Sequence, residues 1–391
     1  MPGGGDSLHR VGPASHTEAA ELMRDCADKG VSLRPVGSGT KLRWGRTTPG
    51  PDLELAMDRL NRVLEHNAGD FTAVMQPGVK LADAQQILAD KDQMVALDPP
   101  LQDSAATLGG IVATGDSGPL RHRFNAPRDL ILGITVALSD GTVARSGGQV
   151  IKNVAGYDLG KLFAGSFGTL GLILELTVRL HPLPPGTATA TAETDDPDAL
   201  ERTASALAHA HIETNSLDLA WSAGRGRVLA RFGGAEPAQQ AEAARRVIED
   251  EGLDPVMIED DAKLWERQRA GQRSYGGLVV RVSGLQGEAA RVIRAAEPLG
   301  GSVVGRAGLG LYWVKLEHAG VAEAVAGVRE MRSHLGPLPC VVLDAPQAAR
   351  PAMDPWGWEK ADDGALRLMR SVKARFDPAG VCNPGIFVGG I

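Results

Sequence analysis

The chain has 391 residues, of which 43% are hydrophobic and 23% are charged, and its formal net charge is −7. This length predicts two domains or slightly more, and the composition is that of an ordinary globular protein. The acidic balance excludes a broad electrostatic attraction to nucleic acid or to anionic membranes. No apolar run reaches the roughly 18 residues that cross a bilayer, and the start MPGGGDSLHR lacks the apolar core of a secretory signal. We therefore expect a cytoplasmic protein.

The three cysteines, Cys26, Cys340 and Cys382, lie far apart in the sequence and form no CxxC pair. This usage predicts free and mostly buried thiols in a reducing compartment. Three scattered cysteines do not supply a four-thiolate iron–sulfur cluster or a typical zinc site within one chain. The histidines are also dispersed, and His209 and His211 fall two residues apart in a predicted helix, on different sides of it. We expect no metal site.

The first half of the chain alternates short strands and helices with glycine-rich segments. In chain order, the patterns predict a helix over 17–29, a strand over 31–36, a strand over 71–76, a helix over 81–90, a structured loop with a short helix over 98–120, a hairpin of 130–138 and 142–146 around Ser139-Asp140-Gly141, a helix over 157–165 and a strand over 170–180. The proline cluster at 181–186 indicates a linker and a domain boundary.

Beyond this linker the order of predicted elements repeats. The patterns predict a strand at 187–193, a helix at 197–210, strands at 216–221 and 227–233, a helix at 236–251, a strand at 253–258, a connecting helix near 261–270, and then a strand at 278–283, a helix at 287–298, strands at 302–306 and 310–316, a helix at 320–335 and a strand at 338–343. This order is β-α-β-β-α-β written twice, which favours an antiparallel sheet with helices on one face. A further helix is predicted over 365–375 in the tail.

Three segments of the first half combine glycine with small hydroxyl residues. PVGSGTK at 35–41 follows a strand, and its glycines allow backbone amides to converge into a nest that binds a diphosphate. DPPLQDSAATLGGIVATGDSGP at 98–119 places small residues where a helix approaches a bulky flat ligand, and GGQVIKNVAGYDLGKLFAGSFGTLGLI at 147–173 suits a tight passage beside an adenine. Each segment alone is also compatible with an ordinary glycine-rich turn. None matches GxGxxG or the Walker pattern.

Together, the order and spacing of these segments resemble the vanillyl-alcohol-oxidase/PCMH type of FAD-binding oxidoreductases. Within that group the chain is similar to the FAD-binding E subunits of bacterial glycolate oxidases. The resemblance rests on PVGSGTK, TLGGIVATGDSGPLRHRFNAPRDLILG, GGQVIKNVAGYDLGKLFAG and the ending FDPAGVCNPGIFVGGI. It implies an α+β fold with a two-subdomain PCMH-type FAD-binding domain at 1–182, an antiparallel-sheet cap at 187–345 and a C-terminal segment at 346–391 that packs back on the FAD domain.

The resemblance also implies a set of cofactor-binding residues. These are Pro35, Val36, Gly37, Ser38, Gly39, Thr40 and Lys41 for the diphosphate, Pro100, Thr107, Leu108, Gly109, Gly110, Thr114, Gly115, Ser117, Gly118 and Pro119 for the diphosphate, ribityl chain and flavin, and Gly165, Gly168 and Ile173 for the adenine end. Relatives with covalent flavin place a histidine where this chain has Thr40, so non-covalent FAD is expected. No catalytic residue is assigned.

The substrate site has fewer indications. Arg121, Arg123 and Arg128 either pair with carboxylates such as Asp129 or orient anionic groups near the flavin. Candidates from the second half are Arg231, Arg281, Arg306, Tyr312, Trp313 and Lys315, each of which also suits a surface or packing role. The histidine-rich metal signature of related D-2-hydroxy-acid dehydrogenases is missing. The usual closing motif Asn-Pro-Gly-Arg-Phe has Ile386 in place of arginine.

The resemblance implies an FAD-bearing subunit of a glycolate (2-hydroxy acid) oxidase or dehydrogenase complex. Its partners would be a second flavoprotein subunit and an iron–sulfur subunit, and any membrane association would pass through them. Two alternatives remain at this stage: an FAD-containing assembly module without turnover of its own, and a stand-alone FAD-dependent alcohol or hydroxy-acid oxidase.

Overall fold

The computed structural model describes residues 9–100, 105–148, 158–358 and 363–391. The α-helices are α1 (His16–Lys29), α2 (Leu81–Ala89), α3 (Leu108–Thr114), α4 (Arg121–Phe124), α5 (Pro127–Leu130), α6 (Gly160–Phe163), α7 (Pro197–His209), α8 (Pro237–Asp250), α9 (Ala262–Ala270), α10 (Ala289–Ala296), α11 (Val321–Leu335) and α12 (Asp363–Phe376). The strands are β1 (His9–Val11), β2 (Leu33–Val36), β3 (Leu53–Ala56), β4 (Val63–Asn67), β5 (Thr72–Met75), β6 (Gln93–Met94), β7 (Ile131–Ala137), β8 (Val143–Gly147), β9 (Leu172–Arg179), β10 (His181–Pro182), β11 (Gly186–Thr194), β12 (Ser216–Ser222), β13 (Arg225–Gly234), β14 (Pro255–Ile258), β15 (Leu278–Ser283), β16 (Ser302–Arg306), β17 (Leu311–Leu316) and β18 (Cys340–Asp344).

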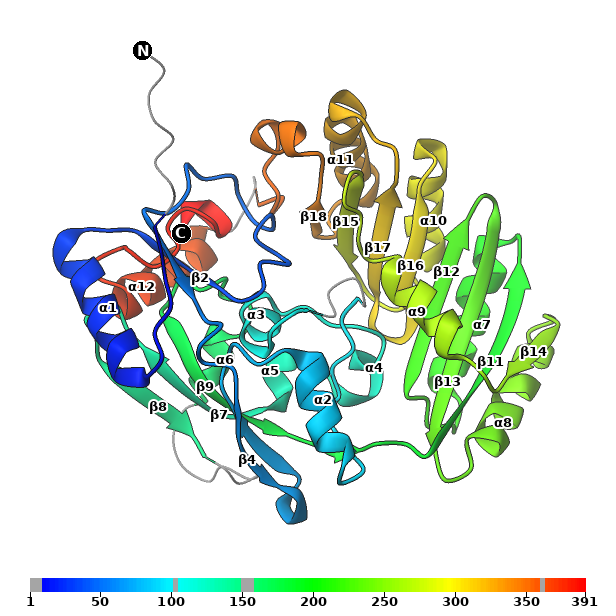
Figure 1. Ribbon diagram of the computed structural model, residues 1–391. Coiled ribbons are helices and arrows are strands. Elements are labelled where there is room, and N and C mark those ends of the chain that lie inside the picture. Colours follow the sequence, from blue (N-terminus) through cyan, green and yellow to red (C-terminus); the bar gives the residue numbers. More distant parts are fainter. Residues whose placement is uncertain (1–8, 101–104, 149–157, 359–362) are drawn as a thin grey trace.

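The first half contains two main sheets. Strands β1, β3 and β2 form a parallel three-stranded sheet in that order, and β4-β5-β9-β7-β8 form an antiparallel five-stranded sheet. One apolar core packs α2 and α3 against the five-stranded sheet, and a second core joins α1 to β2 and β3. The two cores meet at β7 and β9, so the glycine-rich loops after β2 and before β9 are held close together (Figure 1).

The second half is one antiparallel eight-stranded sheet in the order β14-β11-β13-β12-β16-β17-β15-β18. Its element order, β11-α7-β12-β13-α8-β14 followed after α9 by β15-α10-β16-β17-α11-β18, is the doubled order that the sequence pattern predicts. Helices α7, α8, α10 and α11 cover one face (Figure 1). In β15, Leu278, Val280 and Val282 face these helices, because successive strand residues point to opposite sides.

The other face of this sheet is turned toward the first half. Here Trp44, from the loop after β2, packs with Val279, Val304, Trp313 and Leu343 of the sheet. Helix α9 lies on the same face, where its Trp265 donates a hydrogen bond to Thr189 at 2.9 Å and its Gln268 donates to Asp218 at 2.9 Å. The open sheet face is thus the surface along which the two halves meet.

The end of the chain returns to the first half. The backbone of Leu33 in β2 donates to Val381 at 2.8 Å and accepts from Asn383 at 2.7 Å, which adds the tail to the edge of the β2 sheet. Lys373 of α12 donates to the carbonyl of Thr169 at 2.7 Å, and Phe376 packs edge-on against Phe163 at 5.6 Å between ring centroids. The tail therefore contacts β2, which leads into the first glycine-rich segment, and the third segment itself.

Several local expectations change in the structure. In α2, Leu81, Ala84 and Leu88 form the buried stripe, while Ile87, although apolar, is 45% exposed. The proline cluster at 181–186 includes strand β10, which pairs with β6, and the first residue of β11. Part of the helix expected over 157–165 lies outside the described residues, and the described part is the single turn α6.

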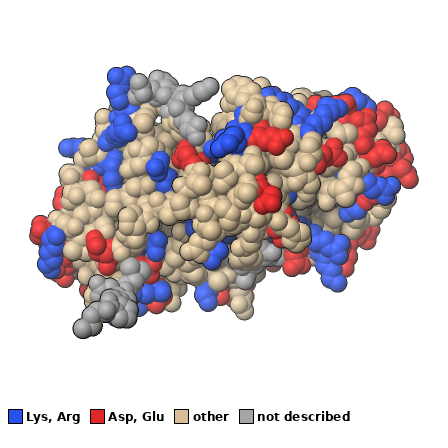
Figure 2. All heavy atoms as spheres, turned by 90° about the horizontal axis from the view of Figure 1, so that it is seen from above, with Lys and Arg blue, Asp and Glu red and all other residues tan. Residues whose placement is uncertain are grey.

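The three cysteines are free and buried, as predicted. The surface seen from above in Figure 2 mixes Lys and Arg with Asp and Glu around a broad uncharged middle region, in keeping with the small net charge. In the part of the chain that the structure describes, none of the helices combines the length and apolar character needed to cross a membrane.

Candidate cofactor site

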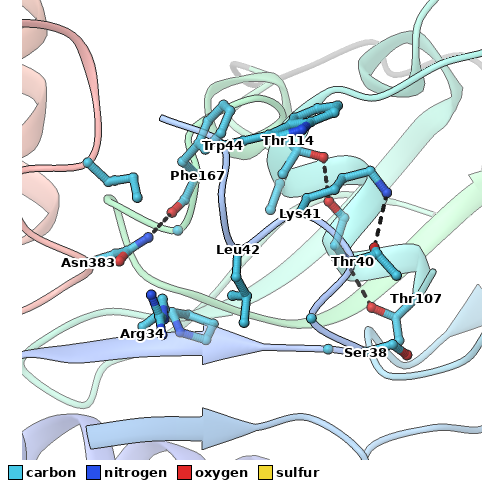
Figure 3. Close-up of a pocket in the computed structure, with 17 residues that line it drawn as sticks. Arg34, Ser38, Thr40, Lys41, Leu42, Trp44, Thr107, Thr114, Phe167 and Asn383 are labelled. Carbon is cyan, nitrogen blue, oxygen red and sulfur yellow. Dashed lines mark hydrogen bonds between the residues drawn. The ribbon is translucent and has the colours of Figure 1, made fainter. Parts of the chain in front are cut away.

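A hollow beside the loop after β2 is lined by residues from four separate parts of the sequence (Figure 3). It contains about 630 Å³ of space between protein atoms, part of it open to solvent. The lining residues are Arg34, Pro35, Gly37, Ser38, Gly39, Thr40, Lys41, Leu42, Trp44, Thr107, Gly110, Ala113, Thr114, Phe167, Gly168, Asn383 and Ile386. A second hollow shares Pro35, Gly37, Thr107, Gly110, Ala113 and Gly168 with it and continues to Met57, Pro77, Gly109, Ser166, Gly171, Leu172 and Ile173.

The loop after β2 has the geometry of an anion-binding nest. Gly39 has a φ of +76°, which side-chain-bearing residues rarely adopt, and it reverses the chain direction at the pocket. Among the described residues, the backbone N–H groups of Ser38, Gly39 and Thr40 donate to no other group. Three successive free amides beside a hollow fit an anionic oxygen-rich group such as a diphosphate, so the loop fits the expected cofactor on its own geometry.

The second glycine-rich segment packs directly on this loop. A Cβ atom added to Gly37 would lie 2.1 Å from Oγ1 of Thr107, and one added to Gly109 would lie 2.5 Å from Cβ of Pro77. Ser38 Oγ donates to the carbonyl of Ala105 at 2.6 Å, which fastens the loop to the approach to α3. These glycines are therefore required by close approach within the protein, and α3 presents its small residues to the hollow.

The third glycine-rich segment and the C-terminal tail complete the lining of the hollow. Backbone N–H groups of Gly165 and Phe167 donate to the carbonyls of Val112 and Ala113 at 2.9 and 2.8 Å, so this segment lies along α3. Asn383 Nδ2 donates to the carbonyl of Phe167 at 2.7 Å (Figure 3). The structure thus brings all three predicted segments together, with the tail added.

The predicted residues divide into two sets. Those that line the two hollows are Pro35, Gly37, Ser38, Gly39, Thr40, Lys41, Thr107, Gly109, Gly110, Thr114, Gly168 and Ile173. Those that lie outside both linings are Val36, Pro100, Leu108, Gly115, Ser117, Gly118, Pro119 and Gly165. Leu108 is fully buried in the core, and Gly118 packs so tightly on Asp98 that an added Cβ would lie 1.6 Å from its carbonyl oxygen. The segments at 101–104 and 149–157, with most of KNVAGYD, lie outside the described residues.

Sequence reasoning missed several lining residues. They are Arg34, Leu42, Trp44, Met57, Pro77, Ser166, Phe167, Leu172 and Asn383. Ser166, Phe167 and Leu172 lie inside the third predicted segment, next to residues that were selected. Ala113 and Gly171, small residues of the predicted segments, also line the hollows. Trp44 had a weaker signal, as a lone tryptophan directly after a glycine loop, and Ile386 was singled out only as a departure from a motif.

The charged residues near the second segment are mostly paired with carboxylates. Lys41, which was expected at the diphosphate, lies 3.2 Å from Asp116, and both side chains are almost completely buried. Arg123 pairs with Glu213 at 2.8 Å, and Arg128 lies 3.6 Å from Asp129. Of the two roles considered for these arginines, pairing describes Arg123 and Arg128.

The loop after β2, residues 37–46, is called the nucleotide loop below. It is also hydrogen-bonded to the second half of the chain. Arg273 forms a buried ion pair with Asp344 at 2.9 Å and donates to the carbonyl of Thr40 at 3.2 Å. Trp44 Nε1 donates to the other oxygen of Asp344 at 3.1 Å, and the Arg273 guanidinium lies over the Trp44 ring at 5.1 Å. One carboxylate of the sheet therefore contacts both Arg273 of the second half and Trp44 of the loop.

A second polar network crosses the interface near Ser117. Gln272 donates to the Ser117 carbonyl at 3.0 Å and accepts from Arg306 at 2.7 Å. Arg306, completely buried, lies 3.6 Å from Asp218, which also accepts from Gln268. The segment that was expected to line the flavin is thus held by side chains of the second half.

Two carboxylic acids of this network have raised pKa values. Burial raises the pKa of Asp98 to about 7, although Arg269, Arg306 and the hydrogen bond from the Leu120 backbone oppose the shift. Burial likewise raises the pKa of Asp218 to about 6, against the effect of Arg306. Both groups change charge near neutral pH at the junction of the two halves.

The remaining substrate-site candidates from the second half differ in their surroundings: some are paired with carboxylates, one is buried under the helices and one lies on the open sheet face. Arg231 pairs with Asp261 at 2.8 Å, Lys315 pairs with Glu317 at 2.7 Å, and Tyr312 is buried under the helices. Trp313 lies on the open face of the sheet. Among the described residues, no group of three or more histidine, cysteine, aspartate or glutamate side chains is placed to hold a metal ion.

Two domain families match the chain. The FAD binding domain family matches residues 8–147, and the C-terminal domain family of FAD linked oxidases matches residues 352–386. The first match covers the nucleotide loop and α3, and the second ends at Ile386 in the tail that lines the hollow. The matches confirm the resemblance to FAD-linked oxidoreductases and FAD as the cofactor.

Curated relatives agree with this assignment. Over 208 residues, 53% of this chain and 44% of the relative, the chain is 33% identical to glycolate oxidase subunit GlcD of Bacillus subtilis. Over 148 residues, 38% of this chain and 42% of the relative, it is 34% identical to glycolate oxidase subunit GlcE of Escherichia coli. It is also 31% identical over 174 residues, 44% of this chain and 30% of the relative, to a mitochondrial D-lactate dehydrogenase [cytochrome] of Arabidopsis thaliana. The matched regions span less than half of each of these relatives.

Solved structures with low sequence identity share the fold. A p-cresol methylhydroxylase structure aligns with a TM-score of 0.73 at 14% identity and covers 96% of this chain and 88% of that chain. An alkyldihydroxyacetonephosphate synthase structure aligns with a TM-score of 0.72 at 15% identity and covers 96% of this chain and 75% of that chain. The mixed helix and strand architecture is therefore that of PCMH-type structures.

Proposed function

We propose that this chain, an FAD-dependent oxidoreductase by its two matched domains, is the FAD-bearing subunit of a glycolate (2-hydroxy acid) oxidase or dehydrogenase complex. In this proposal residues 1–182 form the two-subdomain FAD-binding domain. Residues 187–345 form the cap, and residues 346–391 complete the FAD site from the tail. The single observation that carries the proposal is the convergence of the three glycine-rich segments and the tail on one hollow.

The proposed contacts follow from the chemistry of the lining residues. The free amides of Ser38, Gly39 and Thr40 hold the diphosphate, because they are three donors without another partner among the described residues. The small residues of α3, such as Gly110 and Thr114, adjoin the extended middle of the cofactor. The apolar continuation of the hollow toward Ile173 receives the adenine. In this proposal, the predicted residues that lie outside both linings pack behind the lining residues and do not contact the cofactor.

When bound, FAD would supply the redox chemistry, which is two-electron oxidation of an alcohol carbon and one-electron transfer to an iron–sulfur acceptor. The chain itself positions the cofactor and shields it from solvent. Trp44 lines the hollow and packs against the open sheet face, so in this proposal the sheet covers the cofactor on that side. The three cysteines are buried and far apart, so in this proposal the iron–sulfur centre belongs to a partner subunit.

The partners in this proposal are a second flavoprotein subunit and an iron–sulfur subunit. The relatives named as glycolate oxidase subunits GlcD and GlcE support such an assembly, and three further relatives are named D-lactate dehydrogenases. In this proposal the choice among small 2-hydroxy acids falls to groups on the open sheet face, against which Trp44 of the hollow's lining packs.

One observation favours a second candidate function, an FAD-containing assembly module without turnover of its own. Ile386 lines the hollow at the position where an arginine is usual, and it packs against Gly45, where an added Cβ would lie 2.7 Å from it. An apolar side chain at this position gives the substrate no charged anchor from the tail.

Anaerobic reduction of the purified chain separates these functions. Glycolate or D-lactate is added without air, and the absorbance of oxidised flavin near ~450 nm is followed, first alone and then with the partner subunits. Bleaching of the isolated chain supports dehydrogenation by this subunit, and bleaching only with partners supports relay of electrons. Flavin that stays oxidised in both cases supports the assembly module, and a chain that takes up no FAD overturns the proposal. Hydrogen peroxide release by the isolated chain in air would point to a stand-alone oxidase.

A further inference from the structure

Another hollow lies beside the proline cluster at 181–186, where the two halves meet. This linker hollow contains about 1310 Å³ of space between protein atoms, part of it open to solvent. Its lining comes from α4 and α5, from the end of β9 and the proline cluster, and from the residues around the start of β12 and the end of β13. Its described lining residues all differ from those of the two hollows at the cofactor site. The linker hollow is therefore a separate space, and its size admits a small-molecule ligand.

The walls of the linker hollow are held by contacts within the protein. Three of its lining residues are prolines, whose rings restrict the backbone. Between two of them, the backbone of Leu183 donates to the carbonyl of Asp92 at 2.8 Å. On the other side, a Cβ added to Gly233 would lie 3.1 Å from Pro184, so β13 packs closely on the cluster. A hollow with such walls needs little ordering when a ligand binds.

Arg179, the last residue of β9, carries a charge into this hollow. Its neighbours Val178 and Leu180 are buried in the core of the first half. Because successive residues of an extended chain point to opposite sides, the Arg179 side chain points away from that core and lines the hollow. Among the described residues, this side chain forms no ion pair or hydrogen bond. Its guanidinium donors are therefore available to a ligand.

The other charged residues of the lining leave the hollow with more positive than negative charge. Arg123 pairs at 2.8 Å with Glu213, whose side chain is 77% exposed, and an exposed pair of this kind contributes little to stability. Asp129 is the one carboxylate of the described lining. It accepts from the backbone of Ala126 at 3.1 Å and lies 3.6 Å from Arg128. The lining thus has two arginines for one carboxylate.

Next to Arg179 the lining is aromatic and apolar. The rings of Phe124 and His181 lie 4.6 Å apart between centroids, tilted by 56°. Burial, together with the charges of Arg179 and Arg123, lowers the pKa of His181 to about 4, so this imidazole is neutral at neutral pH. Leu183, which is 41% exposed, extends the apolar surface. Arg179 and His181 are two residues apart and line the same hollow, so a cation and a ring surface adjoin.

We propose that the linker hollow binds an organic anion that carries an aromatic ring, with Arg179 holding the acid group and Phe124 and His181 contacting the ring. The planar guanidinium offers paired donors that match the oxygens of a carboxylate or a phosphate. The two side-chain rings offer the apolar contact that a flat ring prefers. This site goes beyond the proposed function, because it shares no lining residue with the cofactor site and its ligand does not contact the flavin.

The test titrates the FAD-loaded protein with two probes, 2-naphthoate and 2-naphthyl phosphate, which distinguish a carboxylate ligand from a phosphate ligand. Binding is measured by calorimetry, and the flavin spectrum is recorded in parallel. We expect saturable binding of at least one probe without a change in the flavin spectrum. Arg179→Met should weaken this binding at least about tenfold, the loss expected for one charge-assisted contact. His181→Gln, which removes a ring, should weaken it about threefold.

Two further variants separate ligand binding from structure. Arg179→Lys keeps the charge and should retain more of the affinity than Arg179→Met does. Arg225→Met changes an arginine outside the hollow whose side chain is 77% exposed, and it should bind the probe as the unchanged protein does. Because Arg179 is exposed and forms no ion pair among the described residues, Arg179→Met should change the melting temperature by less than ~2 °C.

Four results would overturn the proposal. They are the absence of saturable binding of either probe, equal affinity in the unchanged protein and Arg179→Met, equal competition by inorganic phosphate, and a flavin spectrum that changes with probe binding. The third would indicate a general anion patch, and the fourth would place the probe in the cofactor site. If Arg179→Met instead weakens association with partner subunits while the unchanged protein binds neither probe, the hollow is a protein interface and the small-molecule site is rejected.

Discussion

Asp98 and Asp218 place two carboxylic acids with raised pKa values at the junction of the two halves. In the unfolded chain their pKa values return to the ordinary value of 3.8, so between about pH 4 and pH 7 the folded protein binds more protons than the unfolded chain. The stability that these groups contribute is complete below pH 3.8 and is lost as the pH rises through 6 and 7. With respect to these two groups, the junction is therefore most stable below about pH 4 and loses stability as the pH rises toward neutral.

We predict that Asp98→Asn makes the free energy of unfolding less dependent on pH between 5 and 8. The amide keeps an oxygen to accept from the Leu120 backbone, at 3.0 Å in the unchanged protein, but it cannot ionise. Each unit of pKa shift corresponds to about 1.4 kcal/mol, so the variant should gain on the order of 1–3 kcal/mol relative to the unchanged protein over this range. Urea denaturation at several pH values measures this. An equal slope in both proteins would mean that Asp98 is ionised throughout, and Asp250→Asn at the exposed end of α8 serves as the control.

At single positions, the sequence predicted residue types better than contacts. Gly37 and Gly39 were selected for backbone freedom and Gly109 for its small size. Of these three, the structure shows close approach at Gly37 and Gly109 and positive φ only at Gly39. Trp44 was not predicted, because its partners Asp344 and Arg273 are about 300 and 230 residues away in the chain, and no local pattern encodes such a contact.

At the scale of elements, the contact between the nucleotide loop and α3 depends on the absence of a side chain at Gly37. We predict that Gly37→Ala lowers the retained flavin at least about tenfold, because the new Cβ would lie 2.1 Å from Thr107 Oγ1 and must push α3 away from the loop. The flavin-to-protein absorbance ratio after purification measures retention. Gly69→Ala is the control, since a Cβ there meets nothing within 4 Å. Normal flavin content in Gly37→Ala would show that the loop and α3 separate without loss of the site.

Most elements could be predicted because their patterns are local. The doubled β-α-β-β-α-β order follows from alternation in strands such as β15 and from the apolar stripes of helices such as α10. Strands β1 and β3 were missed, since they are three and four residues long and gain stability from parallel pairing with residues distant in sequence. The packing of the open sheet face against the first half could not be predicted from the sequence. Hydrophobic periodicity indicates that a strand face is buried, but it does not identify the segment that covers that face.

At the scale of the whole molecule, the nucleotide loop is the element that joins FAD to the second half. Its carbonyl at Thr40 accepts from Arg273, and its Trp44 is held by Asp344, so a ligand that orders the loop also orders the sheet edge at β18. A ligand that binds only the folded state stabilises it by mass action, by roughly 4 kcal/mol when present at a thousandfold excess over its Kd. Through these contacts the stabilisation is expected to reach both halves.

We predict that FAD removal increases hydrogen exchange at 340–346 as well as in the loop at 37–46. Asp344→Asn removes the ion pair between Asp344 and Arg273, and loss of one member of a buried ion pair costs about 3–5 kcal/mol in comparable cases. In this variant the exchange at 340–346 should be high and should respond little to FAD, while the response of the loop persists. Exchange measured by mass spectrometry with and without FAD resolves the two segments. If the 340–346 segment of the unchanged protein is equally protected in both states, the two halves are joined independently of the cofactor, and the loop is a binding element only.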